Sequence, residues 1–382
     1  MTDRLPRDPA SPEDRRDWAT RRTGASLSTV ARSVIPPEAL PGNIENAIGA
    51  AQVPIGLAGP LRVRGEHCDE EVVVPLATTE GTLVASYSRG MRIVTEGGGV
   101  KTTVVERYMQ RAPVFHCEDA RAARDLGVWL GEREEGLRAA AEATTSVGKL
   151  AFVQCFVVGP KLYTRFNYTT GDAAGQNMTG RATLAACEWV RTNHPGAPAF
   201  TLSGAIDTDK KHSHMNTLHS RGARVVAEFT LTDALARERL RVGTREMFRA
   251  RLTSNAGGML AGTVNNGMHA ANGLTALFIA TGQDVANVAE SHAAILYVDL
   301  LDNDDLYWSI TLPSLIVATH GGGTNLPTQA ECLDLLGCRG TGKVLRLCEI
   351  MAATVLAGEL SLAGAVLAGD WVTSHEALGR NR

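Results

Sequence analysis

The sequence predicts an α+β protein in which a large mixed α/β domain is interrupted by a smaller inserted domain. The chain of 382 residues is long enough for two or more domains. Between residues 113 and 202, strand and helix patterns follow the order β-α-β-β-α-β, which is the order of the ferredoxin-like fold. We therefore predict a large domain over residues 36–112 and 203–370, and an inserted ferredoxin-like domain over residues 113–202.

The two ends of the chain are predicted to lie outside these domains. Residues 1–35 are a polar lead, rich in Arg and Asp and without an apolar signal segment, and we expect this lead to be flexible. Residues 371–382, which carry His375, are expected to form a flexible tail.

The apolar patterns of the large domain alternate between strands and helices. The expected strands are 71–76, 223–230, 296–300 and 306–317, and the expected helices are 82–93, 233–252, 259–281, 328–336 and 343–367. The most apolar region, Ile350 to Trp371, contains Glu359 and Asp370, whereas a membrane span needs about 20 apolar residues. We expect a buried helix here and a soluble protein.

The inserted domain is predicted from six shorter patterns. They are strands 114–117, 150–158, 161–168 and 199–202, and helices 118–144 and 177–191. Gly159 and Pro160 are a turn signal between the two middle strands, and the alternation from Leu162 to Tyr168 is typical of a sheet with one buried face.

Composition argues against several classes of partner and cofactor. The net charge is -3 and charged residues make up 21% of the chain, so no basic surface for nucleic acid is indicated. The seven cysteines are odd in number and scattered, and the ten histidines include no His-Glu-x-x-His motif. We therefore expect neither disulfides nor a metal site, and a cytoplasmic location.

A charged cluster follows the apolar run 199–202. Ser203 opens this segment, and Asp209 precedes the adjacent Lys210 and Lys211. Burial would push a lysine toward its neutral form while nearby carboxylates favour the cation, so a lysine held here is suited to stabilise a developing oxyanion. The alternative is a solvated turn, which is the usual explanation for an isolated Asp-Lys-Lys.

A second candidate is Glu80, which lies between a buried strand and a helix. A carboxyl group desolvated there would favour its protonated form, which suits a general acid. The alternative is a glutamate that is favoured by the dipole at a helix start. In the helix that follows, Ser86 and Arg89 share one face, although such residues are more often surface polar groups than ligands.

Two weaker signals are a glycine-rich turn and a polar group in an apolar helix. The turn, Thr169 to Asn177, lies between a strand and a helix, where backbone N–H groups can bind a pyrophosphate; an ordinary turn with Asp172 as helix N-cap is the alternative. His269 and Asn272 share a helix face and Asp284 follows the helix. Buried polar groups of this kind need partners, and a satisfied core histidine is the usual explanation.

In combination and order, these motifs closely resemble those of the hydroxymethylglutaryl-CoA reductase family, over roughly residues 44–375. The Thr-Thr-Glu-Gly form resembles the class that uses NADPH, without the membrane anchor of its eukaryotic members. The stretches that carry the resemblance are Pro75-Leu76-Ala77-Thr78-Thr79-Glu80-Gly81 followed by Leu83-Val84-Ala85-Ser86, Gly171-Asp172-Ala173-x-Gly175-x-Asn177-Met178, Thr208-Asp209-Lys210-Lys211, Ala280-Thr281-Gly282-Gln283-Asp284, Gly321-Gly322-Gly323-Thr324-Asn325, Ala357-Gly358-Glu359-Leu360-Ser361-Leu362 and the late Ser374-His375.

The resemblance implies an enzyme that reduces hydroxymethylglutaryl-CoA to mevalonate and free CoA with NADPH. Lys210 would stabilise the oxyanion, Glu80 would donate a proton, and Asp284 would hold the lysine. His375 would protonate the departing thiolate. In the family the site forms between subunits, so the resemblance also implies a homodimer or a larger homo-oligomer.

The resemblance assigns binding roles as well. The residues implied for NADPH are Asp172, Ala173, Ala174, Gly175, Gln176, Asn177, Gly321 and Gly322. The residues implied for the acyl-CoA substrate are Ser86 and Arg89 at CoA, and Arg111, Ser203, Asp209, Lys211, His269 and Asn272 around the acyl group.

The substrate side departs from the family pattern. Where the family has a lysine that binds the substrate's terminal carboxylate, spacing places Thr253, and Arg251 is the nearest replacement. Residues 205–207 also differ from the usual Asn, Tyr and small residue. These changes leave open a relative that reduces a different acyl thioester in a specialised pathway; a catalytically silent binding protein on this fold is a third reading. The preference for NADPH over NADH rests on the class resemblance, because the family's Ser-Arg-Phe near residues 145–149 is not matched.

Overall fold

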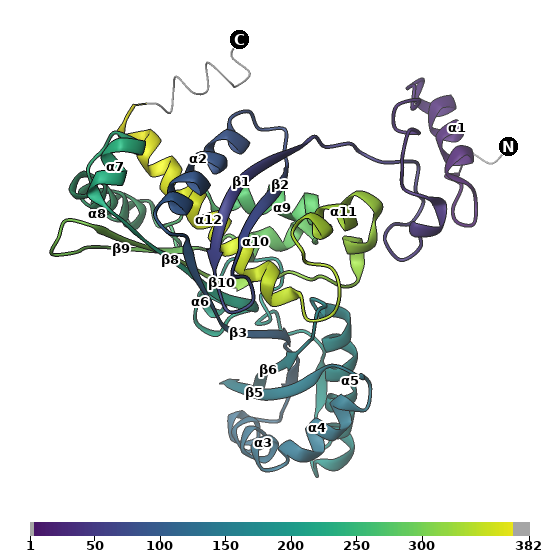
Figure 1. The fold of residues 1–382 in the computed structure, drawn as a ribbon. Coiled ribbons are helices and arrows are strands. Elements are labelled where there is room, and N and C mark those ends of the chain that lie inside the picture. The colour runs from purple at the N-terminus through teal and green to yellow at the C-terminus, as the bar shows by residue number, and fades with distance from the viewer. Residues whose placement is uncertain (1–3, 370–382) are drawn as a thin grey trace.

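The structure is a computed structural model that describes residues 4–369 and has the predicted mixture of strands and helices (Figure 1). The strands are β1 (Ile55–Arg64), β2 (Glu71–Ala77), β3 (Val100–Arg111), β4 (Val114–His116), β5 (Lys149–Val158), β6 (Lys161–Thr169), β7 (Ala199–Thr201), β8 (Gly222–Leu231), β9 (Ile295–Leu300) and β10 (Leu306–Leu315). The helices are α1 (Pro12–Thr23), α2 (Leu83–Glu96), α3 (Ala120–Glu132), α4 (Glu134–Glu142), α5 (Gln176–Asn193), α6 (His214–His219), α7 (Asp233–Leu240), α8 (Thr244–Ala261), α9 (Ala270–Thr281), α10 (Val288–Ser291), α11 (Pro327–Leu335) and α12 (Val344–Leu367), with short 3-10 turns η1 (Pro37–Ala39), η2 (Val285–Asn287) and η3 (Gly322–Asn325).

One sheet runs through the described chain. Its strand order is β7-β4-β6-β3-β8-β10-β9, with β5 beside β6, and with β1 paired to both β2 and β3. The long strand β3 connects two groups of strands: Lys101–Tyr108 pair antiparallel with β8, and Met109–Arg111 pair antiparallel with β6. A single strand therefore positions the two groups relative to each other.

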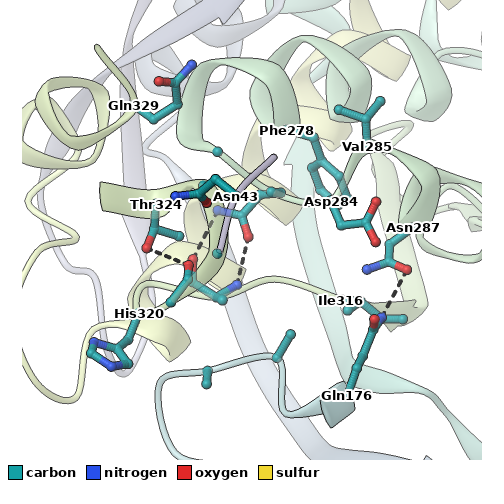
Figure 2. Close-up of a pocket in the computed structure, with 18 of the residues that line it drawn as sticks. Asn43, Gln176, Phe278, Asp284, Val285, Asn287, Ile316, His320, Thr324 and Gln329 are labelled. Carbon is teal, nitrogen blue, oxygen red and sulfur yellow. Dashed lines mark hydrogen bonds between the residues drawn. The ribbon is translucent and has the colours of Figure 1, made fainter. Parts of the chain in front are cut away.

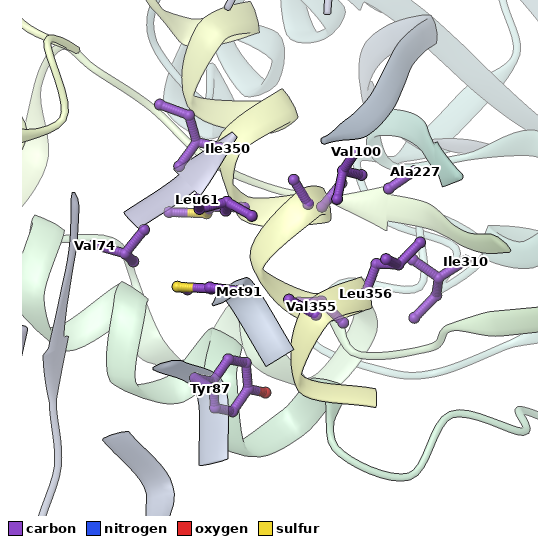
Figure 3. Close-up of a cluster of buried hydrophobic side chains, with 14 of the residues drawn as sticks. Leu61, Val74, Tyr87, Met91, Val100, Ala227, Ile310, Ile350, Val355 and Leu356 are labelled. Atoms are coloured by element: carbon purple, nitrogen blue, oxygen red, sulfur yellow. The ribbon is translucent and has the colours of Figure 1, made fainter. Parts of the chain in front are cut away.

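The larger hydrophobic core surrounds α12 (Figure 3). Side chains of three strands, such as Leu61, Val100 and Ile310, gather around Val355 and Leu356 of this helix. Within residues 4–369, α12 is the one helix long and apolar enough to cross a membrane, and 78% of its most apolar window is buried inside the protein. The prediction of a buried helix is confirmed.

Two glutamates of α12 are fully buried and bind backbone N–H groups of other segments. Glu359 accepts hydrogen bonds from residues 268–270, at the start of α9, over distances of 2.6 to 3.0 Å. Glu349 accepts hydrogen bonds from residues 66 and 67 at 3.0 Å. Because the first N–H groups of a helix have no partner within it, Glu359 fixes where α9 begins.

The segment 113–202 has a hydrophobic core of its own, which includes Phe115, Leu126, Phe166 and Cys187. Its four strands lie antiparallel in the order β7-β4-β6-β5, and α3, α4 and α5 pack against them (Figure 1). The single helix expected over 118–144 is two helices, because Arg133 leaves helical geometry with φ -114° and ψ 24°. The bend lets residues of both helices reach the same core.

The helical stretches expected over 233–252 and 259–281 are also divided differently. α7 ends at Arg241, which has a left-handed φ of 59°, and α8 then runs through to Ala261. Gly262, with φ 72°, ends α8. A loop separates it from α9, whose start is fixed by Glu359. The prediction of one continuous helix over 259–281 is therefore wrong.

Several elements have no counterpart among the predictions, including β3, α6, α10, β1 and α1. β1 is a strand although Gly59 and Pro60 indicate turns; its register against β2 shifts between Ala58 and Leu61, which accommodates them. The N-terminal segment, expected to be a flexible lead, contains α1, which begins with a capping box at Ser11. Arg15 of α1 is buried and donates to the carbonyl oxygen of Ala47 at 2.9 Å.

Candidate active site

The segment 203–211, the lysine loop below, has a strained backbone. Three of its residues, Ala205, Thr208 and Lys210, have positive φ angles of 67°, 55° and 55°, a conformation that costs roughly 1–2 kcal/mol in residues other than glycine. The fully buried Asn216 offsets this strain, because it accepts a hydrogen bond from the Thr208 hydroxyl and donates to the carbonyl oxygen of Lys211 at 3.0 Å. Tertiary contacts, not local propensity, therefore set the shape of the loop.

The lysine loop brings Lys210 to Asp284, the residue that the family resemblance implies as its partner. The Lys210 Nζ lies 3.0 Å from Asp284 Oδ2, and the other oxygen of Asp284 accepts the N–H of Ala286 at 3.1 Å. The hydrogen bond that the Lys210 ammonium group donates to Asp284 is the main reason that the pKa of Lys210 is raised, so this group stays charged at neutral pH. The Lys210 side chain is 43% exposed, which leaves this cation open to a ligand.

A buried charge network lies beneath the lysine loop. The Arg221 side chain, only 2% exposed, lies 2.8 Å from Asp209 Oδ1 and 3.5 Å from Glu290 Oε1. Glu290 accepts the backbone N–H of Lys210 at 3.0 Å. Burial raises the pKa of Glu290 to about 7, against the opposing effects of the Lys210 N–H and the Arg221 charge.

A second ion pair lies at the start of the loop. Arg111 at the end of β3 contacts Asp207 Oδ2 at 3.2 Å, and Asp207 is buried with 4% exposure. The Ser203 hydroxyl also donates to Asp207, at 3.4 Å. Lys211 is exposed and binds the carbonyl oxygen of Asp209 at 2.9 Å. The expected substrate residues Arg111, Ser203, Asp209 and Lys211 thus lie together.

Glu80 and Asn272 form a separate polar pair. The Asn272 amide donates to both carboxylate oxygens of Glu80, at 2.9 and 3.0 Å. Glu80 is exposed in the single chain, so the prediction that it is desolvated is wrong for one chain by itself. The turn that presents it is strained, since Thr82 has a φ of 75°.

The remaining predicted substrate residues lie around α2. Ser86 and Arg89 share one face, as expected, and both bind the hydroxyl of Ser361 on α12, at 3.2 and 3.0 Å. His269 is buried, and its ring stacks on Tyr87 with 4.8 Å between centroids. Burial lowers the pKa of His269 to about 4, and its Nε2 has no hydrogen-bond partner in the described part of the chain. The ring is therefore neutral at physiological pH.

A cleft of about 720 Å³ brings the predicted cofactor residues together with Asp284 (Figure 2). The predicted residues that line it are Ala173, Ala174, Gly175, Gln176, Asn177, Gly321 and Gly322. Figure 2 shows Gln176 joined to Asn287, at 3.2 Å, below Asp284. His320, which the sequence analysis did not single out, also lines the cleft.

Asp172 differs from the other predicted cofactor residues. Its carboxylate accepts the N–H groups of Gly342 and Val344, at 2.8 and 3.2 Å, and so caps the start of α12. It is absent from the lining of the cleft. The alternative prediction, Asp172 as the N-cap of α5, is wrong, because Gly175 occupies that position without a side-chain cap.

Contacts between side chains and backbone atoms, together with one close backbone approach, maintain the shape of the cleft. The Gln283 amide donates to the carbonyl oxygen of Ala318 at 3.0 Å and accepts the Ala318 N–H at 2.8 Å. Gly282 packs so closely on Gly323 that a Cβ atom at residue 282 would lie 2.3 Å from the Gly323 oxygen. Arg107 of β3 donates to the carbonyl oxygens of Gly171 and Ala173 and so fixes the glycine-rich turn.

Several supporting residues escaped the sequence analysis, namely Arg107, Arg221, Glu290 and Asn216. No local sequence pattern distinguishes these four residues from surface polar residues, because their partners are not their neighbours in the chain. His375 lies outside the described residues. Within residues 4–369 no group of three His, Cys, Asp or Glu side chains could hold a metal ion, and all seven cysteines are free.

Fold and site define a mixed α/β protein in which a glycine-lined cleft opens beside a lysine–aspartate pair. The sequence profile described as hydroxymethylglutaryl-coenzyme A reductase matches residues 11–380. The chain therefore belongs to the hydroxymethylglutaryl-CoA reductase family.

Individual relatives agree with this assignment. The chain is 41% identical over 374 residues to 3-hydroxy-3-methylglutaryl-coenzyme A reductase of Aeropyrum pernix, covering 96% of this chain and 89% of that protein. For the enzyme of that name from Methanothermobacter thermautotrophicus the identity is 42% over 369 residues, covering 96% and 92%. The structure of the class II enzyme from Streptococcus pneumoniae bound to NADPH is similar in fold, with a TM-score of 0.68 at 21% identity over 94% of each chain.

Proposed function

We propose that this protein reduces the thioester of hydroxymethylglutaryl-CoA to mevalonate and free CoA, with NADPH as the reductant. Family membership supports this proposal, and one observation carries it: the Lys210–Asp284 pair adjoins the cleft that is lined by the predicted cofactor residues. A charged donor beside a dinucleotide-sized cleft is the arrangement that carbonyl reduction needs.

The residues of the cleft fit a nicotinamide dinucleotide. The first N–H groups of α5 have no side-chain cap, and such groups bind phosphate oxygens well. Gly321 and Gly322 have φ angles of 82° and 56°, and the lack of a side chain lets a phosphate approach closely. NADPH supplies hydride when bound; Gly175 to Asn177 and the two glycines would hold it.

The roles of the reacting groups follow from their charges. Lys210, kept protonated by Asp284, stabilises the negative charge that develops on the carbonyl oxygen. Glu80 is the proposed proton donor, and His375 is the proposed acid for the leaving thiolate. Ser86 and Arg89 would contact CoA, while Arg111, Ser203, Asp209, Lys211, His269 and Asn272 would surround the acyl group.

The site is proposed to form between two copies of the chain. Within one chain, Glu80 is bound near the start of α9 and Lys210 is bound just beyond its end. Asn272 and Thr281, the last residue of α9, are roughly 14 Å apart along the helix axis at 1.5 Å per residue, and Asp284 follows beyond that end. Met259 and Leu260 are 83% and 92% exposed at the end of α8, which supports a homodimer in which such residues are covered.

We also propose the domain that carries the cofactor turn and the cellular location of the protein. The order β7-β4-β6-β5 within residues 113–202 supports a ferredoxin-like inserted domain that carries the cofactor turn. Seven free cysteines support a reducing, cytoplasmic location.

A different acyl thioester is the second candidate, and the Arg111–Asp207 ion pair favours it. Asp207 neutralises a cation beside the proposed acyl group. Thr253 is exposed and binds only a backbone oxygen, that of Arg249, in the structure. Arg251 is buried and its guanidinium donates to Asn255 at 2.6 Å, while its Nη1 has no hydrogen-bond partner among residues 4–369.

Steady-state stoichiometry tests the proposal. The purified protein is given hydroxymethylglutaryl-CoA, and NADPH oxidised is counted against free CoA released. Two NADPH per CoA supports the proposed reaction. No turnover by a protein that still binds NADPH contradicts it and favours another acyl-CoA, and a survey of acyl-CoA substrates without any turnover would favour a silent binding protein. A parallel series with NADH measures the cofactor preference.

A further inference from the structure

A buried glutamate lies directly beneath the lysine loop. Glu290 in α10 is not exposed at all. Its Oε1 accepts the Lys210 N–H at 3.0 Å and lies 3.5 Å from Arg221 Nε. Its Oε2 is buried and has no hydrogen-bond partner among residues 4–369. A buried, half-satisfied carboxyl group is costly to retain, and the proposed chemistry gives it no role so far.

The contact falls on the backbone of a strained residue. Lys210 has a left-handed φ of 55°, which an ordinary side chain disfavours. A carboxylate forms a charge-assisted hydrogen bond with a backbone N–H, about twice as strong as a neutral one. The bond therefore stabilises the backbone conformation in which Nζ reaches Asp284.

We propose that Glu290 is a positioning residue, which holds the backbone of Lys210 so that its ammonium group stays beside Asp284. Arg221 supports this arrangement, because it binds both Glu290 and Asp209, the residue before Lys210. Both residues of the Asp209–Lys210 pair are thus fixed from the buried side. The inference deepens the proposed function, and its kinetic readout rests on that function.

The charge of Glu290 changes near neutral pH, since burial raises its pKa to about 7. Arg221 favours the ionised form and Asp209 opposes it. The other charged residues of the lysine loop are Lys210, Lys211 and Asp207, the last of which is paired with Arg111, and Asp284 stands at the start of η2.

The elements packed against α10 add few further charges. The helix α9 has no ionisable side chain, and β10 has only Tyr307, at the strand end opposite α10. On the side of α10 itself, His292 follows Glu290 and faces His212. As pH falls through about 7, the Glu290 carboxylate takes up a proton. Its hydrogen bond with the Lys210 N–H is then no longer charge-assisted, so the backbone of Lys210 is held less firmly.

Glu290→Gln is the first test, because glutamine keeps the size and one acceptor oxygen but not the charge. We expect kcat to fall about tenfold with little change in either KM, since misplacement of a catalytic group by a fraction of an ångström has effects of this order. The acid-side inflection of kcat near pH 7 should disappear. Unchanged kcat with an unchanged pH profile would overturn the proposal.

Glu349→Gln is the matched control. It removes the charge of another buried glutamate that binds backbone N–H groups, but at the turn 66–67, away from the lysine loop. It should leave kcat and the pH profile unchanged. An equal loss of kcat in both variants would indicate that removing any buried carboxylate destabilises the fold as a whole, and it would contradict a positioning role for Glu290.

Stability separates positioning from a structural role. A carboxyl group whose pKa is raised from 4.5 to about 7 on folding contributes stability below its unfolded pKa and loses it as pH rises through the folded value. At pH 8, Glu290→Gln removes a poorly compensated buried charge, so its Tm should equal or exceed that of the wild type. A lower Tm at pH 8 together with the lower kcat would assign a structural role instead.

Amide hydrogen exchange tests the same idea without turnover. The peptide that contains Lys210 should exchange faster in Glu290→Gln than in the wild type at pH 8, and no faster in Glu349→Gln. Equal exchange in all three proteins would overturn the positioning role even if the enzyme is active. Faster exchange in a protein without reductase activity would contradict the proposed function alone.

Discussion

The lysine loop and the cofactor cleft reach special backbone conformations by different means. The loop has three left-handed residues that are not glycine, and buried polar partners, Asn216 and Glu290, hold it. The cleft has glycines at its left-handed positions and is held by contacts to backbone atoms, from the Gln283 amide at Ala318 and from the Arg107 guanidinium at Gly171 and Ala173. The loop should therefore respond to changes of charge and pH, and the cleft to changes of side-chain size and to loss of the Arg107 donor.

The largest effect is expected from Lys210→Met. Loss of one preorganised cation at a developing oxyanion lowers kcat by about 10²–10³-fold, whereas NADPH affinity should be unchanged because Lys210 does not line the cleft. Stopped-flow turnover and NADPH fluorescence titration measure the two quantities. Lys211→Met is the control, with an effect on the substrate KM and not on kcat. A weaker NADPH affinity in Lys210→Met would show that the lysine loop also contributes to cofactor binding, so that the loop and the cleft do not act separately.

Gly282→Ala should damage the cleft through size alone. The substitution meets the Gly323 oxygen and adds a side chain at a φ of 71°, so we expect a loss of about 2–4 kcal/mol of unfolding free energy together with weaker NADPH binding. Urea denaturation and titration measure both. Gly98→Ala is matched in its left-handed φ of 100° but has open space around it. It should cost only about 1 kcal/mol, and an equal loss in the two variants would refute the size argument.

Arg107→Met should weaken cofactor binding without affecting the reaction. The variant leaves the carbonyl oxygens of Gly171 and Ala173 without their donor, so the KM for NADPH should rise about tenfold, which corresponds to roughly 1.4 kcal/mol, with little change in kcat. Arg124→Met, at an exposed arginine of α3, is the control. A fall of kcat with an unchanged KM would place Arg107 with the lysine loop instead.

The smallest effect is expected from Asp207→Asn, which changes selectivity. It frees Arg111 from its 3.2 Å ion pair, so acyl groups with a terminal carboxylate should gain a few-fold in kcat/KM over acyl groups without one. Competition between the two kinds of acyl-CoA measures the ratio. An unchanged ratio would show that Arg111 does not meet the acyl group.

Local sequence signals could predict much of this molecule. Apolar periodicity predicts the strands around Lys210 and the buried helix α12, and turn chemistry predicts one glycine-rich segment of the cleft, Thr169 to Asn177, whereas Gly321 and Gly322 are implied by the family resemblance. The pairing of Lys210 with Asp284 came from the family resemblance, because no periodicity relates residues so far apart in the chain.

The errors have physical causes that a single sequence does not contain. Asp172 stands three residues before Gly175, the N-cap of α5, yet its carboxylate caps α12, since two helix N-termini compete for one acceptor and only the fold decides. Glu290 and Arg221 support the lysine loop from distant positions in the chain. Glu80 is expected to be buried because it follows a buried strand, but the turn that carries it presents its side chain to solvent.

The path of β3 through both groups of strands has a consequence for folding. Lys101 pairs with Glu228 and Met109 pairs with Tyr168, so the sheet closes long loops, which slows folding. The two ends of the segment 113–202 are pinned together, since the Gly204 N–H donates to the Ala112 oxygen at 2.7 Å. We expect this segment to collapse first and to shorten the effective loop between β3 and β8. Pulse-labelled hydrogen exchange should then detect protection in β5 and β6 before β8 and β10, and the reverse order would contradict this expectation.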